Sequence, residues 1–217
     1  MEKDPEIKKF YKKYPFPNDE KIDNHQWILK SLPEPIKEGS SILDIGSGTG
    51  EMSCFLSKYG NVVGIDFSEE SIAKAIELKE KFKIKNLKFD VDNIVLKKER
   101  ETFDYLFCIG VLHHIPEINQ AIENIKECMN KDSYAVISVY NKYGKFFGLQ
   151  KHKKTKNKAR YMDTFEHPYE IYYSKKQFVK ILNQHNLKIV GIWRNIPEIL
   201  RLITGRGELM TFCVKKD

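Results

Sequence analysis

The stretch that decides the fold is Ile42-Leu43-Asp44-Ile45-Gly46-Ser47-Gly48-Thr49-Gly50. Its apolar residues predict a buried strand, and its glycines predict a tight turn, because glycine accepts backbone angles and close approaches that a Cβ forbids. Asp44 lies inside the apolar run, where an isolated carboxylate is costly unless it has partners. A strand, a glycine turn and the start of a helix together indicate a nucleotide site, with free backbone N–H groups directed at the ligand.

The glycine turn alone does not identify the nucleotide, since nicotinamide and flavin enzymes use a similar turn. Three later segments narrow the choice. The segment 62–66 ends in Asp66, 20 residues after Gly46, where a carboxylate can accept hydrogen bonds from both ribose hydroxyls. The segment 87–92 is typical of a strand that ends in acids. The segment 103–116 is typical of a strand that ends in a double histidine.

Taken together, these four segments resemble the class I S-adenosylmethionine-dependent methyltransferases. The resemblance covers about residues 38–140 well and the C-terminal end loosely. It implies a Rossmann-like α/β fold, with a mostly parallel seven-stranded sheet and an antiparallel last strand. It also implies S-adenosylmethionine as cofactor and S-adenosylhomocysteine as product.

The alternation of strand and helix patterns independently predicts a doubly wound parallel sheet with its ligand site at the carboxyl ends of the strands. We expect strands at 41–45, 61–65, 86–91, 103–109, 134–140, 187–193 and 208–214. We expect helices at 25–32, at 49–58, after the N-cap Ser68, from 116, at 174–185 and at 198–203. The apolar stripes of two helices are expected to be Ile72, Ala75, Ile76 and Phe82, and Ile118, Ala121, Ile122, Ile125 and Met129.

Composition predicts one methyltransferase domain over 1–217, with an N-terminal cap at 1–38 and an insertion at 141–174. No apolar run reaches the roughly 18 residues of a membrane span, and the acidic N-terminus is unlike a secretory signal. The scattered cysteines read as buried thiols, which are typical of a reducing cytoplasm. We therefore expect a cytoplasmic protein. The cysteines are Cys54, Cys108, Cys128 and Cys213.

The resemblance assigns roles around the cofactor residue by residue. Asp44 would support the ammonium group, either directly or through the glycine loop. Asp66 would accept from the ribose hydroxyls, and Asp90 from the adenine amino group. Asp90 and Asp92 are close enough in sequence for these two to exchange roles. The remaining implied cofactor residues are Gly46, Ser47, Gly48 and Gly50 in the loop, with Phe67, Val91 and Ile109 against the adenosyl group.

His113 and His114 follow the fourth strand, at the expected mouth of the site. A histidine there can take a proton from the nucleophile, because its ordinary pKa is near neutrality. The alternative is that one histidine packs against backbone and the other caps the next helix. Family members with unrelated substrates share double histidines at this point, so the pair does not identify the reaction.

Two aromatic segments flank the site. The segment 161–170, together with Tyr172 and Tyr173, is expected either to form a lid over the acceptor or to be a surface loop with its own aromatic cluster. As a lid it would use Tyr161, Phe165 and Tyr169, with Asp163 or His167 as further catalytic candidates; no metal site is expected from this segment. The N-terminal residues Tyr11, Tyr14 and Phe16 would either cover the methionine end of the cofactor or pack on the sheet.

The net charge of +7 has a local origin. Residues 142–160 hold seven lysines and one arginine and no acid. We expect a small-molecule acceptor. The alternative is transfer RNA, whose phosphates this basic tract would hold. A third possibility is a cofactor-binding regulatory protein without transfer activity, against which the intact Gly46, Asp66 and Asp90 argue. The sequence leaves the oligomeric state open.

Overall fold

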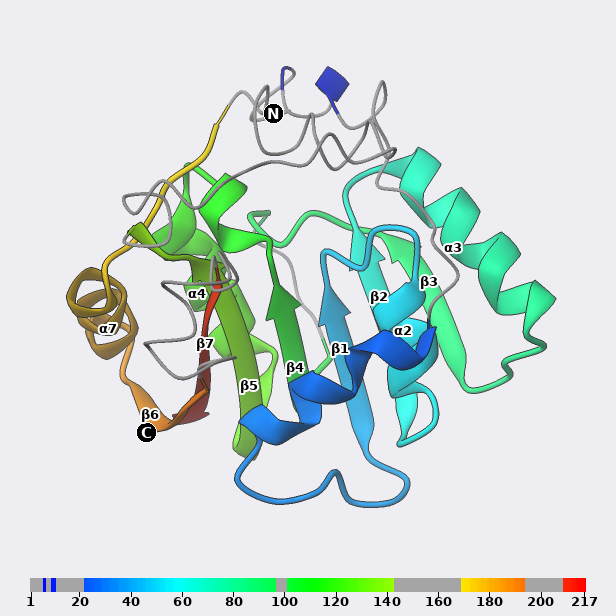
Figure 1. The fold of residues 1–217 in the computed structure, drawn as a ribbon, viewed down its shortest axis with the longest axis horizontal. Coiled ribbons are helices and arrows are strands. Elements are labelled where there is room, and N and C mark those ends of the chain that lie inside the picture. The colour runs from blue at the N-terminus through cyan, green and yellow to red at the C-terminus, as the bar shows by residue number, and fades with distance from the viewer. Residues whose placement is uncertain (1–5, 7–8, 11–21, 97–100, 143–168, 194–208) are drawn as a thin grey trace, which may run out of the picture.

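The computed structural model describes residues 6, 9–10, 22–96, 101–142, 169–193 and 209–217 (Figure 1). Most of the basic tract and the helix expected at 198–203 lie outside these ranges. The single residues proposed above that also lie outside are Tyr11, Tyr14, Phe16, Tyr161, Asp163, Phe165 and His167. The roles proposed for them remain predictions.

A seven-stranded sheet with the order β3-β2-β1-β4-β5-β7-β6 forms the centre of the molecule (Figure 1). Among the described strands, β7 runs antiparallel to both of its neighbours and the other pairs are parallel. This confirms the predicted doubly wound sheet with a reversed last strand. The strands are β1 (Ser41–Ile45), β2 (Asn61–Asp66), β3 (Leu87–Val91), β4 (Phe103–Ile109), β5 (Met129–Tyr140), β6 (Leu187–Trp193) and β7 (Leu209–Lys216).

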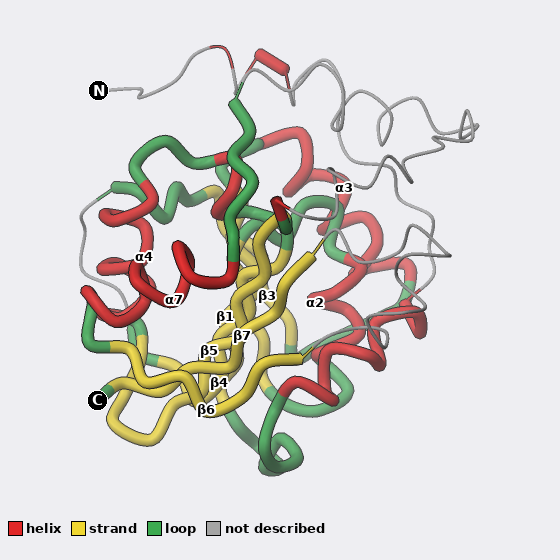
Figure 2. The backbone as a smooth tube through the Cα atoms, turned by 60° about the vertical axis from the view of Figure 1, so that its left-hand side comes forward, coloured by secondary structure: helices red, strands yellow, loops and turns green. Residues whose placement is uncertain are grey.

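Helices cover both faces of the sheet, α2 and α3 on one side and α4 and α7 on the other (Figure 2). The described α-helices are α2 (Glu51–Leu56), α3 (Glu69–Lys81), α4 (Ile118–Glu127) and α7 (Lys175–Gln184). Two segments, η1 (Ile22–Ser31) and η2 (Leu112–His114), are 3-10 helices. The helices that follow β1 and β2 share one face, whereas the helix that follows β4 lies on the other. The winding therefore reverses between β1 and β4, and this is the position where open α/β sheets bind ligands.

In the central strands of the sheet, alternate residues enter two separate apolar layers. In β1, Ile42 packs with the layer under η1 and α2, whereas Leu43 and Ile45 pack with the layer under α4 and α7. Asp44 therefore faces α2. All four cysteines are buried and free, as predicted. None of the described helices has the length and apolar character that crossing a membrane requires.

Several element ends differ from the sequence prediction. The first helix after β1 begins at Glu51 rather than residue 49, because Gly50 has a φ of 87° in the left-handed region. The fifth strand begins at Met129 rather than residue 134. Met129 was expected on the inner face of α4, but that helix ends at Glu127, so the prediction for Met129 was wrong.

The predicted apolar stripe of α3 was also partly wrong. The helix begins as expected, because the Ser68 hydroxyl accepts a hydrogen bond from the Ser71 N–H. Its buried residues are Ser71, Ile72, Ala75 and Leu78. Ile76 is 40% exposed, since it lies a further 100° around the helix from Ala75, and Phe82 is 45% exposed just beyond the helix end.

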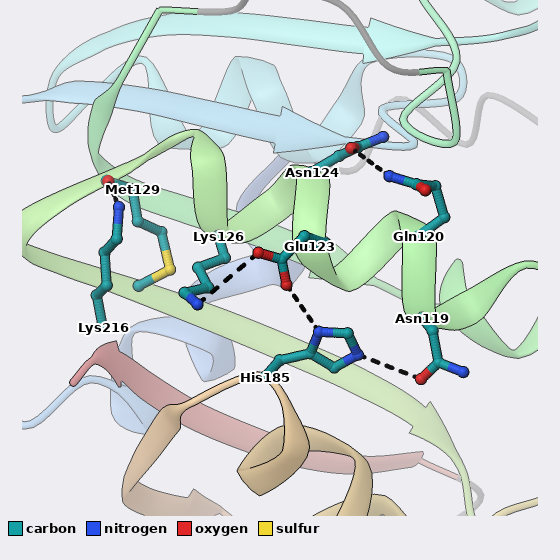
Figure 3. Close-up of polar contacts among 8 residues, drawn as sticks. All are labelled: Asn119, Gln120, Glu123, Asn124, Lys126, Met129, His185 and Lys216. Carbon is teal, nitrogen blue, oxygen red and sulfur yellow. Dashed lines mark hydrogen bonds and ion pairs between the residues drawn. The ribbon is translucent and has the colours of Figure 1, made fainter.

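Polar contacts join α4 to the end of α7 (Figure 3). His185 follows α7, and its Nδ1 lies 2.9 Å from Glu123 Oε2 while its Nε2 lies 3.2 Å from Asn119 Oδ1. The His185 hydrogen bond is the main cause that lowers the pKa of the Glu123 carboxyl. Ser174 caps the other end of α7 in a capping box with Gln177, as the sequence predicted for the start of this helix.

Candidate cofactor and acceptor site

Two loops meet where the winding of the sheet reverses. The loop 46–50 follows β1, and Gly110-Val111 follows β4. Gly46 has a φ of 72°, and a Cβ built on it would lie 2.3 Å from Val111 Cγ2. The two loops are therefore in direct contact, and glycine is required at position 46 for both its conformation and its size.

The backbone of the glycine loop is held by the protein itself. The N–H groups of Gly46 and Ser47 donate to the Ile65 carbonyl at 2.8 and 2.9 Å, and the Gly50 N–H donates to the Ser47 carbonyl at 2.9 Å. The Gly48 N–H donates to Asp66 Oδ2 at 2.9 Å. The expectation that these N–H groups are free was therefore wrong for these four residues. Hydrogen bonds to β2 therefore hold the backbone of this loop in place.

Asp66 joins the glycine loop to the start of α3. Its Oδ2 accepts the Gly48 N–H, and its Oδ1 accepts the Ser68 N–H at 2.9 Å. Burial raises the pKa of the Asp66 carboxyl, and the backbone hydrogen bonds from Ser68, Gly48 and Phe67 oppose that rise. Each carboxylate oxygen has two lone pairs, so both can still accept a hydroxyl donor from a ligand.

Two buried oxygen atoms beside the loop have no hydrogen-bond partner among the described residues. They are Asp44 Oδ1 and Ser47 Oγ. The other Asp44 oxygen, Oδ2, accepts the hydroxyl of Ser53. Burial raises the pKa of Asp44 to about 7; the Ser53 hydrogen bond opposes this rise and the nearby Asp66 charge adds to it. Unsatisfied buried polar atoms are costly, so a ligand with an ammonium and a carboxylate group fits this position.

There is open space beside the loop that follows β1 and beside the loop that follows β4. A Cβ added at Gly48 or at Gly110 would meet no described heavy atom within 4 Å, although both residues have positive φ, 53° and 76°. The Gly110 N–H donates to Ser138 Oγ at 3.0 Å, which fixes this loop to β5. Ile109, the last residue of β4, is half-buried.

The two acids at the end of β3, whose roles the sequence left interchangeable, differ in burial. Asp90 is exposed, whereas Asp92 is half-buried, and its N–H donates to the Asp66 carbonyl at 2.9 Å. The register partner of Asp66 is Val91, so Asp90 and Asp92 lie one residue to either side of it, and Asp92 is the more buried of the two acids. Val91 is 50% exposed and Phe67 is half-buried, so both leave apolar surface at this end of the sheet.

The two histidines are buried, and they contact a stack of aromatic rings. The His113 ring stacks on Tyr140, with 3.7 Å between ring centroids, and Tyr140 stacks on Tyr172 at 5.3 Å. His114 lies edge-on to Tyr140, and its Nδ1 is 3.2 Å from the Tyr169 carbonyl oxygen. Because a carbonyl only accepts, this Nδ1 carries the proton. Burial lowers the pKa of His114 to about 4, so the ring is neutral at neutral pH.

The segment 169–173, on which the lid hypothesis partly rests, is fastened to the sheet. The Ile171 N–H donates to the His113 carbonyl, and the Tyr173 N–H donates to the Tyr140 carbonyl, both at 2.9 Å. Tyr169 is half-buried. This segment lies against η2 and β5, and the remaining lid candidates lie outside the described residues.

Sequence reasoning missed several residues of this site. Ser53 and Tyr140 lie inside regular elements, where their types gave no signal. Successive side chains of β1 point to opposite faces of the sheet, and Asp44 shares the face of Ile42, toward α2, so a search for polar residues on that helix would have found Ser53.

Comparison with known proteins places the chain among methyltransferases. A family described as a methyltransferase domain matches residues 36–192. Ubiquinone biosynthesis O-methyltransferase of Coxiella burnetii is 30% identical over 117 residues, 52% of this chain and 50% of that protein. Phosphoethanolamine N-methyltransferase 2 of Caenorhabditis elegans is 31% identical over 134 residues, 60% of this chain and 30% of that protein. Magnesium protoporphyrin IX methyltransferase from Synechocystis, solved with bound S-adenosylmethionine, has a TM-score of 0.62 and 16% identity, covering 91% of this chain and 79% of that chain.

The strand order, the reversed β7 and the glycine loop after β1 define the class I S-adenosylmethionine-dependent methyltransferase fold. Since the family match spans well over half of its length, the chain belongs to the methyltransferase-domain family, whose cofactor is S-adenosylmethionine. The aligned segments span half of the Coxiella protein and 30% of the Caenorhabditis protein.

Proposed function

We propose that this domain transfers a methyl group from S-adenosylmethionine to a small-molecule acceptor by in-line displacement. The observation that carries the proposal is the pair of buried oxygens beside the glycine loop, Asp44 Oδ1 and Ser47 Oγ, which have no partner among the described residues. The cofactor's sulfonium supplies an already activated methyl group. The protein's own residues therefore bind, orient and exclude water.

In this proposal the residues along the strand ends divide the cofactor between them. Asp44 Oδ1 accepts from the ammonium group and the Ser47 hydroxyl donates to the carboxylate. Asp66 accepts from the ribose hydroxyls, using lone pairs that its backbone donors leave. For the adenine contact we propose Asp92 in place of the expected Asp90, because Asp92 is half-buried whereas Asp90 is exposed. Phe67, Val91 and Ile109 contribute apolar surface.

Neither histidine is proposed as a general base. A side chain whose pKa lies near 4 is a weak proton acceptor for a nucleophile at neutral pH, and His114 is in that range. His113 is fully buried against Tyr140. We propose that the stack of His113, Tyr140 and Tyr172 forms an acceptor-side wall instead.

The names of the relatives support a small acceptor. One is a ubiquinone biosynthesis O-methyltransferase and another a phosphoethanolamine N-methyltransferase. They differ in the acceptor atom, so the proposal names the size of the acceptor and leaves the atom to experiment. Main-chain hydrogen bonds hold residues 169–173 against η2 and β5, and we propose that this segment borders a compact acceptor pocket.

The test measures S-adenosylhomocysteine formation with small phenols, amines and thiols in parallel with transfer RNA. We expect turnover with at least one small class and none with transfer RNA. Turnover with transfer RNA alone would contradict the proposal, above all if charge reversal of Lys151, Lys153 and Lys154 abolished it and high salt suppressed it. Cofactor binding without turnover on any acceptor would favour a regulatory role.

A further inference from the structure

A buried serine on α2 contacts the acid of β1. Ser53 and Asp44 are both fully buried, and the Ser53 hydroxyl donates to Asp44 Oδ2. The other carboxylate oxygen, Oδ1, has no partner among the described residues. One oxygen of this carboxylate is thus held by the protein, and one is left for a ligand.

The neighbouring strand is shaped around this contact. Gly64 of β2 is in register with Asp44 of β1. A Cβ added at Gly64 would lie 2.8 Å from Ser53 Oγ and 2.6 Å from the Phe89 ring. Gly64 has an ordinary strand conformation, so the space it leaves, rather than its backbone angles, explains glycine at this position.

We propose that Ser53 is a positioning residue for the cofactor: its hydroxyl fixes the Asp44 carboxylate so that Oδ1 receives the cofactor's ammonium group, and it favours the ionised form of that carboxylate. This inference rests on the proposed role of Asp44. It adds a residue that does not itself touch the cofactor, and it makes cofactor affinity depend on pH.

The charges around Asp44 support this role. Within the described part of the chain, the titratable groups that interact with Asp44 are Asp66 on β2, Cys54 on α2 and Cys108 on β4. Burial and the Asp44 charge raise the pKa of both thiols, that of Cys54 to about 12, so both stay neutral. Burial and Asp66 hold the pKa of Asp44 near 7, and the Ser53 hydrogen bond is the contribution that lowers it.

The direction of the pH effect follows from these causes. Below its pKa, Asp44 takes up a proton and no longer attracts an ammonium group, so affinity falls by about tenfold per pH unit well below that point. Removal of the Ser53 hydroxyl takes away the lowering contribution. The midpoint of the affinity change must then move to higher pH.

The experiment titrates S-adenosylhomocysteine into wild type, Ser53→Ala and Ser53→Thr at pH 6, 7 and 8. For Ser53→Ala we expect about fivefold weaker binding at pH 7, if the pKa of Asp44 rises by about one unit, with much of the loss recovered at pH 8. Ser53→Thr keeps the hydroxyl and should bind like wild type. Binding of 5′-methylthioadenosine, which lacks the amino-acid portion, should be unchanged in all variants.

The control is Ser133→Ala. Ser133 is also a fully buried serine, and its hydroxyl donates to the Phe103 carbonyl at the amino-terminal end of β4. It should lose stability without any change in the pH dependence of binding. If Ser53→Ala does not fold, Ser53→Cys, which keeps a weak donor of similar size, takes its place with a smaller expected shift.

Two results would overturn the inference. One is an unchanged pH midpoint for Ser53→Ala, and the other is an equal loss for S-adenosylhomocysteine and 5′-methylthioadenosine. Failure of the wild type to bind S-adenosylhomocysteine at any pH would instead contradict the proposed function itself, and the two failures are therefore distinguishable.

Discussion

Asp66 shows how one side chain can serve both the fold and a ligand. It accepts backbone N–H groups from Gly48 and Ser68, so it fastens the glycine loop to the start of α3. Substitution should therefore affect stability and cofactor binding together. Separating the two effects requires a second carboxylate with a similar structural role but no ligand.

Asp104 provides that control. It lies at the amino-terminal end of β4 and accepts the Ser41 N–H at 2.8 Å. We expect Asp66→Asn to weaken S-adenosylhomocysteine binding by about tenfold or more, since a hydrogen bond to a charged group contributes roughly 1.5–3 kcal/mol. Asp104→Asn should lower the melting temperature and leave binding unchanged. Calorimetric titration and thermal unfolding measure both, and equal affinities for wild type and Asp66→Asn would contradict the assignment.

His114 should make stability depend on pH. Its pKa falls from 6.5 to about 4 on folding because of burial, so between these values the unfolded chain binds a proton that the folded chain does not. Stability is therefore lost as pH decreases through this window, by up to ~3 kcal/mol. The raised pKa of Asp44 has the opposite sign, since its stability cost grows as pH rises from 3.8 to about 7.

The two contributions oppose each other in the wild type, so the prediction concerns a difference. The stability of wild type relative to His114→Gln should fall between pH 7 and pH 4.5. Urea unfolding at the two pH values measures it. A constant difference would mean that folding leaves the pKa of His114 unchanged, against the lowering that its burial causes.

At the scale of elements, the glycine loop is where conformation and ligand space coincide. Gly46 and Gly48 both have positive φ, which costs other residues roughly 1–2 kcal/mol. They differ in surroundings, because a Cβ meets Val111 at Gly46 and no described atom within 4 Å at Gly48. The same substitution at the two positions should therefore have different consequences.

We expect Gly46→Ala to destabilise the fold strongly, since the Val111 side chain must move as well. Gly48→Ala should cost about 1–2 kcal/mol of stability and place its methyl group in the space left for the cofactor. Its loss of S-adenosylhomocysteine affinity should therefore exceed its loss of stability. Thermal unfolding and ligand titration of both variants make the comparison, and unchanged binding by a folded Gly48→Ala protein would show that the cofactor does not approach this residue.

The elements also show what the sequence can predict. Strand and helix types followed from apolar periodicity, and Ser68 and Ser174 marked two helix starts correctly. The stripe of α3 was misjudged at Ile76 and Phe82 because the exact helix end and phase depend on packing against the sheet. The N–H groups of the glycine loop were wrongly expected to be free, because their acceptors, the Ile65 carbonyl and the Asp66 carboxylate, belong to another strand.

At the scale of the whole molecule, the topology determines where chemistry is possible. The helices change faces between β1 and β4, and the glycine loop, Asp66 and Gly110 lie at the strand ends around that point (Figure 2). The sequence predicted that the ligand site lies at this edge of the sheet, because the strands around it end in polar or glycine residues. It could not predict the aromatic wall of Tyr140 and Tyr172, since that wall depends on a segment more than thirty residues later returning to β5.

A crystal structure with S-adenosylhomocysteine tests the central claim most directly. We expect to find the ribose hydroxyls at the Asp66 carboxylate, the ammonium group at Asp44 Oδ1 and the adenine near Asp92. The sulfur should face toward Tyr140. Ligand density at another edge of the sheet, or at this edge with Asp44 and Asp66 directed away from it, would contradict the account.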